Sequence, residues 1–316
     1  MISFRYHVVT LVSVFLALAV GVALGGGPLK GEEDTTLVDQ VASDRQVKDQ
    51  LQSEIASLRS GDKFADDFAA VVAPGMVANT LRGRVVAVVV LPTARQADVA
   101  GLKSLIGVAG GSVGGTVRVG SRLVDAEDRQ LVEELGKQLQ PRARGVNIPA
   151  DAGPYDRMGS LVARAIGTRT RGGSAVDPPA TTILAGLSAT SLMSAEGRLS
   201  RRGDLVLFVT GPGEGGPDEM RGASTIVTSL VLAVDRGTAG TVLAGPVAAT
   251  RAGGQVKAVR DDVGAARDVS TVDVLDRTAG QVVTVMALAG QAAGKAGHYG
   301  AVDAADGAMP GARSGE

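Results

Sequence analysis

The segment VVAVVVL at residues 85–91 decides the fold, because it is an unbroken apolar run that ends directly at Pro92. A strand with apolar side chains on both faces must be covered on both sides, which is the usual situation of a strand inside a parallel sheet. We therefore predict a central strand at this position, with helices on each face of its sheet.

Segments of strand and helix character alternate after this strand. Further strands are predicted at residues 116–119, 205–209, 241–244 and 272–275, the first of them after a glycine-rich break at residues 110–115. One predicted helix buries Leu102, Leu105 and Ile106, a second is opened by Asp125 and Asp128 in capping positions, and four more lie at residues 155–166, 181–193, 217–234 and 278–293. This alternation predicts an α/β fold with a parallel, Rossmann-like sheet.

The N-terminal part of the chain contains a long apolar segment. Residues 8–25 read VVTLVSVFLALAVGVALG and carry no charge. A helix of this length spans about 27 Å, close to the hydrocarbon thickness of a bilayer, so we predict a transmembrane anchor within residues 1–30. A cleaved signal peptide is the alternative, although its apolar region usually has ~7–15 residues and no clean Ala-x-Ala site follows here.

The charges beside this segment predict its orientation. Arg5 and the terminal amine precede the segment, and Lys30 follows it. Acidic residues count little in the positive-inside rule, so the pattern favours a cytoplasmic N-terminus. We expect a single-pass protein of the cell membrane or envelope whose main domain is extracytoplasmic.

A heptad-like pattern follows the anchor. Its positions alternate in steps of four and three residues and are Leu37, Val41, Asp44, Lys48, Leu51, Ile55 and Leu58. This is the a/d spacing of a coiled coil, so we predict a helical stalk at residues 31–72. An amphipathic helix that lies on the next domain is the alternative for so few heptads.

Two charged residues interrupt the seam of this stalk. In a parallel, in-register homodimer Asp44 would face Asp44 and Lys48 would face Lys48, which costs stability. We therefore expect residues 36–60 to pair with a helix of a different membrane protein, or in an antiparallel arrangement. A homo-oligomer is the remaining alternative.

The rest of the chain divides into two parts. Residues 73–299 form the predicted α/β domain, and residues 300–316 form a tail rich in Gly, Ala and Asp that we expect to be mobile. Hydrophobic residues make up 45% and charged residues 21% of the chain, as in folded proteins.

Charge and cysteine content exclude several classes of function. The chain has 32 basic and 33 acidic side chains, and this net charge of -1 gives no electrostatic footprint for a nucleic-acid partner. It has no cysteine, which excludes disulfides, thiolate metal sites and thiol catalysis.

One glycine pattern has the form of a nucleotide-binding loop. Gly211, Gly213 and Gly216 follow the predicted strand LVLFV and precede a predicted helix, as in a G-x-G-x-x-G fingerprint. Glu214, Asp218 and Glu219 crowd the helix N-terminus, where a pyrophosphate would need free N–H groups and positive potential. We favour a glycine turn with an acidic helix cap over a nucleotide site.

The sequence contains no clear metal or catalytic constellation. The two histidines, His7 and His298, lie at opposite ends of the chain, and the methionines after Met1 have no close helical spacing, so we expect them to pack in the core. We also find no HExxH motif. We predict neither metal ligands, nor cofactors, nor an enzyme.

Several segments together resemble a known family. They are MISFRYHVVTLVSVFLALAVGVALGGGPL at the N-terminus, VVAVVVLPTA, GDLVLFVTGPG, TVLAGP, and the C-terminal stretch RDDVGAARDVSTVDVLDRTAGQVVTVMALAGQAAGKAGHYG. These segments are similar to the actinobacterial copper-transport outer-membrane protein family, MctB, also called SteB in corynebacteria. The resemblance covers nearly the full chain, although no motif in it is a catalytic signature.

The resemblance implies two different roles. One is copper homeostasis at the envelope, through efflux across the outer membrane or through assistance to another transporter. The other is an interaction scaffold that pairs with a second membrane protein in cell separation. An outer-membrane location conflicts with the sequence, because outer-membrane channels are β-barrels built from alternating strands, whereas this chain has one apolar helix and buried parallel strands. Copper itself is implied only by the resemblance, and no residue is assigned to it.

Overall fold

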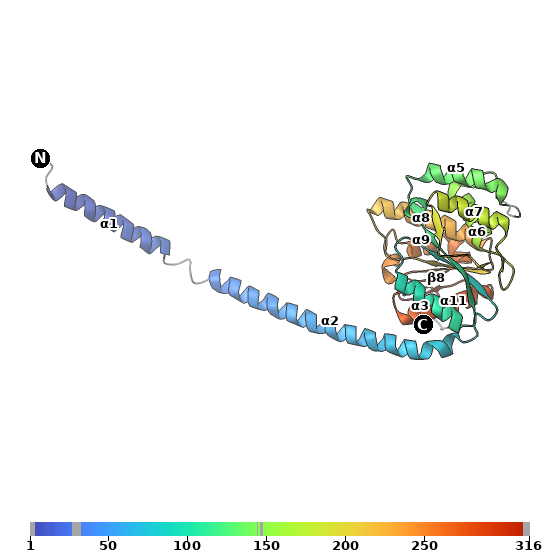
Figure 1. Cartoon of the computed structure of the whole chain (residues 1–316). Helices are drawn as coiled ribbons and strands as arrows, with labels where there is room; N and C mark the ends of the chain where they lie inside the picture. Colours follow the sequence, from blue (N-terminus) through green and yellow to red (C-terminus); the bar gives the residue numbers. More distant parts are fainter. Residues whose placement is uncertain (1–3, 27–32, 144, 146–147, 312–316) are drawn as a thin grey trace. The chain divides into compact units, whose positions relative to one another are not determined.

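The computed structural model describes residues 4–26, 33–143, 145 and 148–311 (Figure 1). Two compact units divide at residue 65, with Met1–Ala65 in one unit and Asp66–Glu316 in the other. The first unit is helical, and the second contains the sheet.

Helix α1, Phe4–Gly26, contains the predicted anchor. Residues Tyr6–Gly25 are long and apolar enough to cross a membrane, and none of them is buried within the protein. A fully exposed apolar helix is unfavourable in water, so its surface is compatible with insertion into a bilayer.

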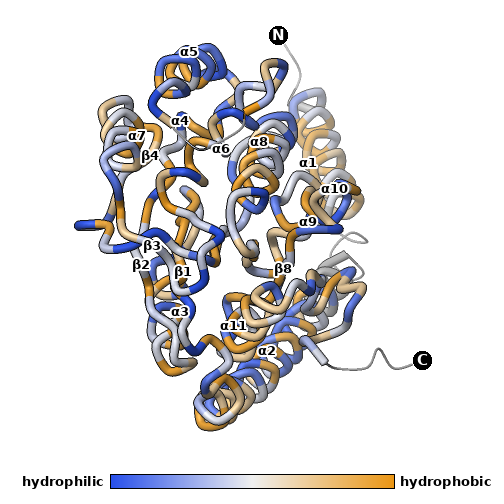
Figure 2. Tube along the Cα trace, turned by 90° about the vertical axis from the view of Figure 1, so that its right-hand side faces the viewer, coloured by the Kyte–Doolittle hydropathy of each residue, from blue (hydrophilic) through white to orange (hydrophobic). Residues whose placement is uncertain are grey.

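Helix α2, Glu33–Val77, is continuous over 45 residues and extends past residue 72, the predicted end of the stalk. Hydrophilic and hydrophobic residues alternate along it (Figure 2). Val41, Leu51, Ile55 and Leu58 have exposed side chains. Near its C-terminal end Ala73 and Val77 are buried, so this end belongs to the core of the second unit.

The second unit is built on one seven-stranded sheet with the order β4-β2-β1-β6-β7-β8-β9. All neighbours pair in parallel except β4, which pairs with β2 in the antiparallel sense at the edge. The strand bounds are β1 Val85–Val90, β2 Ser112–Val119, β4 Met193–Ala195, β6 Leu205–Val209, β7 Thr241–Ala244, β8 Ser270–Val272 and β9 His298–Tyr299. A separate two-stranded sheet pairs β3, Ser174–Ala175, with β5, Arg201–Arg202.

The strand order defines the kind of doubly wound sheet. Counted along the chain, the parallel strands β1, β2, β6, β7, β8 and β9 lie in the order 2-1-3-4-5-6. This extends the flavodoxin-like order 2-1-3-4-5 and differs from the Rossmann order 3-2-1-4-5-6. The chain reverses its direction of winding between β1 and β6, which makes that position the topological switch point.

Two layers of helices cover the sheet (Figure 1). The end of α2 lies on one face with α3, Gln96–Val108, and α11, Thr278–Ala292. The other face carries α4 Ser121–Val124, α5 Arg129–Leu139, α6 Pro154–Ile166, α7 Pro178–Ala189, α8 Pro217–Asp235, α9 Gln255–Asp261 and α10 Val263–Asp268. Two 3₁₀ turns, Gln140–Arg142 and Val247–Thr250, complete the elements.

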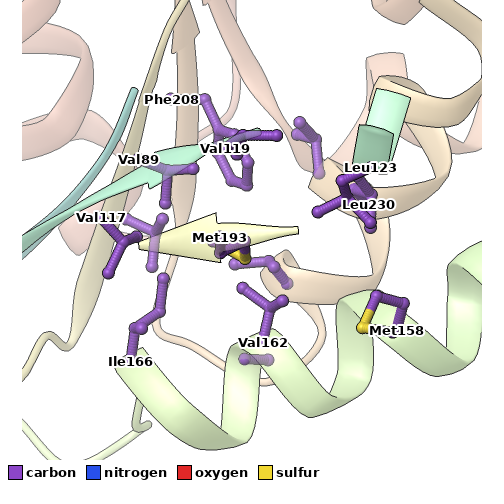
Figure 3. Close-up of a cluster of buried hydrophobic side chains, with 14 of the residues drawn as sticks. Val89, Val117, Val119, Leu123, Met158, Val162, Ile166, Met193, Phe208 and Leu230 are labelled. Atoms are coloured by element: carbon purple, nitrogen blue, oxygen red, sulfur yellow. The ribbon is translucent and has the colours of Figure 1, made fainter. Parts of the chain in front are cut away.

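The core consists of two apolar clusters separated by the sheet. Along β1, Ala87 and Val89 contribute to one cluster, whereas Val86, Val88 and Val90 contribute to the other. Figure 3 shows part of the first cluster, where Met158 and Met193 lie among valine and leucine side chains. Successive side chains of a strand point to opposite faces of the sheet, so the apolar side chains of β1 enter both clusters. The apolar run at residues 85–91 predicts this arrangement.

Several elements differ from the sequence-based prediction. Strand β2 begins at Ser112 and includes Gly114 and Gly115, which we expected to form a break. A Cβ on Gly114 would lie 2.5 Å from the carbonyl oxygen of Arg201, and one on Gly115 would lie 1.9 Å from Leu199 Cδ1. These glycines therefore allow a close approach of the backbone inside a strand.

The ends of other elements also differ. Helix α5 begins at Arg129, and the Asp128 carboxylate pairs with Arg122 at 2.7 Å instead of capping the helix. Helix α7 ends at Ala189, so Met193 begins the edge strand β4. Strand β8 covers Ser270–Val272 and not residues 272–275, and α9, α10 and β9 were not predicted.

A buried ion pair holds the last strand in place. Arg260 Nη1 lies 2.9 Å from Asp273 Oδ2, and both side chains are almost fully buried. Asp273 also accepts hydrogen bonds from the backbone N–H groups of Ala301 and Val302, at 2.7 and 3.1 Å. Arg260 donates to the carbonyl oxygen of Tyr299 at 2.9 Å. The first residues of the predicted mobile tail are thus tied to the sheet.

We expect Asp273→Ala to lower the free energy of unfolding by roughly 3–5 kcal/mol, because it leaves the Arg260 guanidinium buried without its partner. Urea unfolding followed by circular dichroism measures the change. Asp261→Ala is the matched control, since Asp261 forms an exposed pair with Lys257 at 2.9 Å and should leave the midpoint nearly unchanged. Equal losses in the two variants would contradict the role of the buried pair.

A second buried carboxyl predicts a pH dependence of stability. Burial raises the pKa of Asp235 from 3.8 to about 6, and hydrogen bonding to Thr241 only partly opposes this. Since the folded pKa lies above the unfolded value, folding is favoured while the carboxyl is protonated, and this contribution is lost as the pH rises through about 6. We expect Asp235→Asn to stabilise the protein by roughly 1–2 kcal/mol at pH 7.5 and to have little effect at pH ~4. Thermal unfolding at the two pH values tests this, and a pH-independent difference would disprove it.

Candidate functional site

A crevice of about 660 Å³ opens at the carboxyl end of the sheet, where the neighbouring strands β1 and β6 end. Leu91, Pro92 and Thr93 line it from the end of β1, and Gly213 and Glu214 line it from the loop after β6. In open α/β sheets, ligands bind outside the carboxyl ends of the strands at the topological switch point. This position makes the crevice the candidate site, which we call the switch-point crevice.

Close backbone packing shapes the floor of the switch-point crevice. The Gly211 N–H donates to Thr93 Oγ1 at 3.1 Å, and a Cβ on Gly211 would lie 1.8 Å from the Thr93 carbonyl oxygen. Thr210 is buried and donates to Gln255 Oε1 at 3.2 Å. Gln255 is itself 8% exposed and lines the crevice from the start of α9. The two loops are therefore fixed against each other by residues that allow no larger side chain at Gly211.

The glycine loop differs in detail from a dinucleotide-binding turn. Gly213 lines the switch-point crevice, and Gly216 occupies the N-cap position of α8. The positive φ of 92° falls on Gly215, which occupies an x position of the G-x-G-x-x-G pattern and none of its three defined glycines. Glu219 Oε2 accepts the Gly216 N–H at 3.1 Å, so a carboxylate occupies the amide that a phosphate would use. This geometry disfavours a nucleotide in the loop.

The electrostatic character of the switch-point crevice is acidic. No lysine or arginine lines it among the residues that the structure describes, whereas its carboxylates are Asp125, Glu127, Glu214, Asp218 and Glu219. Three of these have local partners, since Asp218 pairs with Arg221, Asp125 accepts the Glu127 N–H at 2.9 Å, and Glu219 accepts the Gly216 N–H. The crevice therefore attracts cations and repels anionic ligands.

The metal-binding donors do not gather in this crevice. Met220 is the methionine that lines it, and Met158 and Met193 lie in the core. His298 Nδ1 lies 2.9 Å from Thr271 Oγ1 on the neighbouring strand, and burial lowers the pKa of the ring. Over residues 4–26, 33–143, 145 and 148–311 no group of three or more His, Cys, Asp or Glu side chains could hold a metal ion.

The predicted stalk residues belong to α2, in the first of the two units. Asp44, Lys48 and the seam residues between Val41 and Leu58 are all exposed. Leu37 belongs to α2, but its side chain lies outside the described residues. A partner helix for this seam stays a prediction.

Sequence reasoning located one wall of the crevice and missed the others. The glycine loop was visible as a motif, whereas Asp125 was interpreted as the opening of a helix and Glu127 was not singled out. Gln255 begins a helix that was not predicted. The strand order brings these three loops together, and the sequence contains no signal for that order.

Comparisons with known proteins match nearly the whole chain. The family model described as "Copper transport outer membrane protein, MctB" matches residues 1–310. The protein named "Copper transporter MctB" from Mycobacterium tuberculosis is 30% identical over 322 residues, which cover 95% of this chain and 96% of that protein. Its namesake from Mycobacterium leprae is 29% identical over 91% of this chain and 92% of the relative. The chain belongs to the MctB family of copper transport proteins.

Proposed function

We propose that this protein acts in copper homeostasis as a single-pass envelope protein, with α1 in a membrane and the α/β unit outside the cytoplasm. The observation that carries the proposal is the family match, which includes α1 and continues to residue 310. Relatives that cover almost the whole chain are named copper transporters. The apolar, fully exposed surface of α1 supports membrane insertion.

The charge pattern supports a cytoplasmic N-terminus. Arg5 precedes the apolar span Tyr6–Gly25, and the acidic residues that follow Lys30 have little influence on orientation. A single apolar helix favours the cytoplasmic membrane, whereas the family description names the outer membrane. We propose the cytoplasmic membrane as the site of anchoring.

Direct chelation of copper receives little support from the donor set. Copper(I) prefers thiolate and thioether ligands, and copper(II) prefers imidazole. The chain has no cysteine, its two histidines are far apart in sequence, and two of its methionines are core residues. We propose that the protein assists another transporter, and that the acidic switch-point crevice takes a cationic or uncharged group of that partner or its cargo.

Deletion of the gene should raise cellular copper and lower copper tolerance, because a component of copper removal is lost. Copper content by mass spectrometry and growth across a copper series measure both effects. The full chain should restore both. A matched variant with a cleavable signal sequence in place of residues 1–30 should fail to restore them, since its domain is exported but not anchored. Unchanged copper content and tolerance in the deletion strain would refute the proposed function.

A second candidate function is a scaffold that pairs through α2. The long helix with exposed Val41, Leu51, Ile55 and Leu58 is the observation that favours it. Exposed apolar side chains at a/d spacing gain stability when a second helix buries them. Asp44 and Lys48 disfavour a parallel homodimer, so we propose a heterologous membrane protein as the partner.

A photo-crosslinking amino acid at position 51 should form an adduct with another membrane protein in cells, because Leu51 lies in the seam. Position 53 is the matched control, since Ser53 is exposed on the opposite face of α2 and should give little adduct. Mass spectrometry of the adduct identifies the partner. Equal adducts at both positions, or adducts only between identical copies, would contradict the heterologous pairing.

A further inference from the structure

A second crevice, of about 630 Å³, lies at the amino end of the parallel strands, opposite the switch-point crevice. The C-terminal parts of α6 and α8 and the segments that lead into β6 and β7 line it. Four of its lining residues are arginines, namely Arg164, Arg169, Arg202 and Arg236. No aspartate or glutamate lines it among the described residues, and we call it the arginine crevice.

Two of these guanidinium groups are half-buried and share one carboxylate. The Arg164 side chain is 11% exposed, and its Nη2 lies 2.6 Å from Asp177 Oδ2. The Arg202 side chain is 16% exposed, and its Nη2 lies 3.8 Å from the same oxygen. Arg164 takes both Asp177 oxygens in a bidentate pair. Burial and the neighbouring Arg164 lower the pKa of Arg202. The pair therefore keeps an excess of positive charge in a partly desolvated position.

The other two arginines are exposed at the mouth of the crevice. Arg169 donates to the carbonyl oxygen of Arg236, which satisfies an unpaired group at the C-terminus of α8. The Arg236 guanidinium makes no hydrogen bond or ion pair with any described residue. Capping of helix ends thus explains Arg169 but not Arg236.

The nearest carboxylates do not neutralise this charge. Asp235 acts electrostatically on Arg169, and Asp268 is influenced by Arg236. Asp268 already binds Arg267 through both of its oxygens, and neither aspartate lines the arginine crevice. Four guanidinium groups therefore surround this space. Among the described residues, Asp177 is the carboxylate that forms ion pairs with two of them, Arg164 and Arg202.

We propose that the arginine crevice binds an anionic ligand through a phosphate or pyrophosphate group. Guanidinium forks match phosphate oxygens in bidentate geometry, and a cluster of several arginines favours a multiply charged anion over a single carboxylate. The volume lies within the range of small-molecule sites. The inference is independent of the copper role. It rests on the crevice at the amino ends of the strands, which has the opposite sign of charge to the switch-point crevice.

The phosphate group could belong to a soluble compound or to the headgroup of an anionic lipid. Inorganic pyrophosphate represents the first source, and phosphatidylcholine vesicles with and without phosphatidylglycerol represent the second. The full chain in phosphatidylcholine nanodiscs is used with both probes. Titration calorimetry measures pyrophosphate binding, and co-sedimentation measures vesicle binding.

Arg236→Gln should weaken the binding of whichever probe binds, pyrophosphate or phosphatidylglycerol vesicles, by about tenfold. The substitution removes charge-assisted hydrogen bonds to the phosphate. Arg129→Gln is the matched control, because Arg129 is an exposed arginine on α5 outside the crevice, and it should bind like the original chain. Affinity should also fall as NaCl increases. Thermal unfolding verifies that both variants fold.

Each outcome decides the proposal. Binding of pyrophosphate, or of phosphatidylglycerol vesicles alone, supports it if Arg236→Gln lowers the affinity and Arg129→Gln does not. The first result identifies a soluble ligand and the second a lipid. Absence of binding to both probes, or equal effects of the two substitutions, would overturn it.

Discussion

Burial of β1 on both faces is the constraint on which the rest of the α/β unit depends. All six residues of Val85–Val90 are buried, with alternate side chains in two separate apolar clusters. A strand of this kind needs neighbours on both sides and a helix layer above and below. Once both faces are covered, the ends of the strands are the part of the sheet that remains open to ligands. The two crevices lie at these ends.

The same constraint explains which elements could be predicted from the sequence. β1, β6, α6, α8 and α11 have long apolar runs or stripes, so local pattern determines them. β4 and β9 have only two or three residues and exist because a neighbouring strand pairs with them. Gly114 and Gly115 have low strand propensity, and their place in β2 depends on the approach of residues 199–201. Similarly, Arg164 and Arg236 are distant in sequence, and the packing of α6 on α8 brings them to one crevice.

Total charge conceals how charge is distributed in this protein. The net value of -1 suggests an electrostatically neutral molecule. Yet carboxylates line the switch-point crevice at the carboxyl ends of the strands, and guanidinium groups line the arginine crevice at their amino ends. The two crevices therefore select ligands of opposite charge. A composition argument addresses the charge of the whole surface, but it has no resolution at the scale of one cavity.

The attachment of residues 301 and 302 to the sheet also protects a strand edge. Their backbone N–H groups donate to Asp273, and β9 pairs with β8 beside it. Loss of the segment from residue 298 onward would expose the backbone N–H and C=O groups along β8. An exposed strand edge is a template for pairing with another chain. A protein truncated before residue 298 would therefore be prone to self-association through β8.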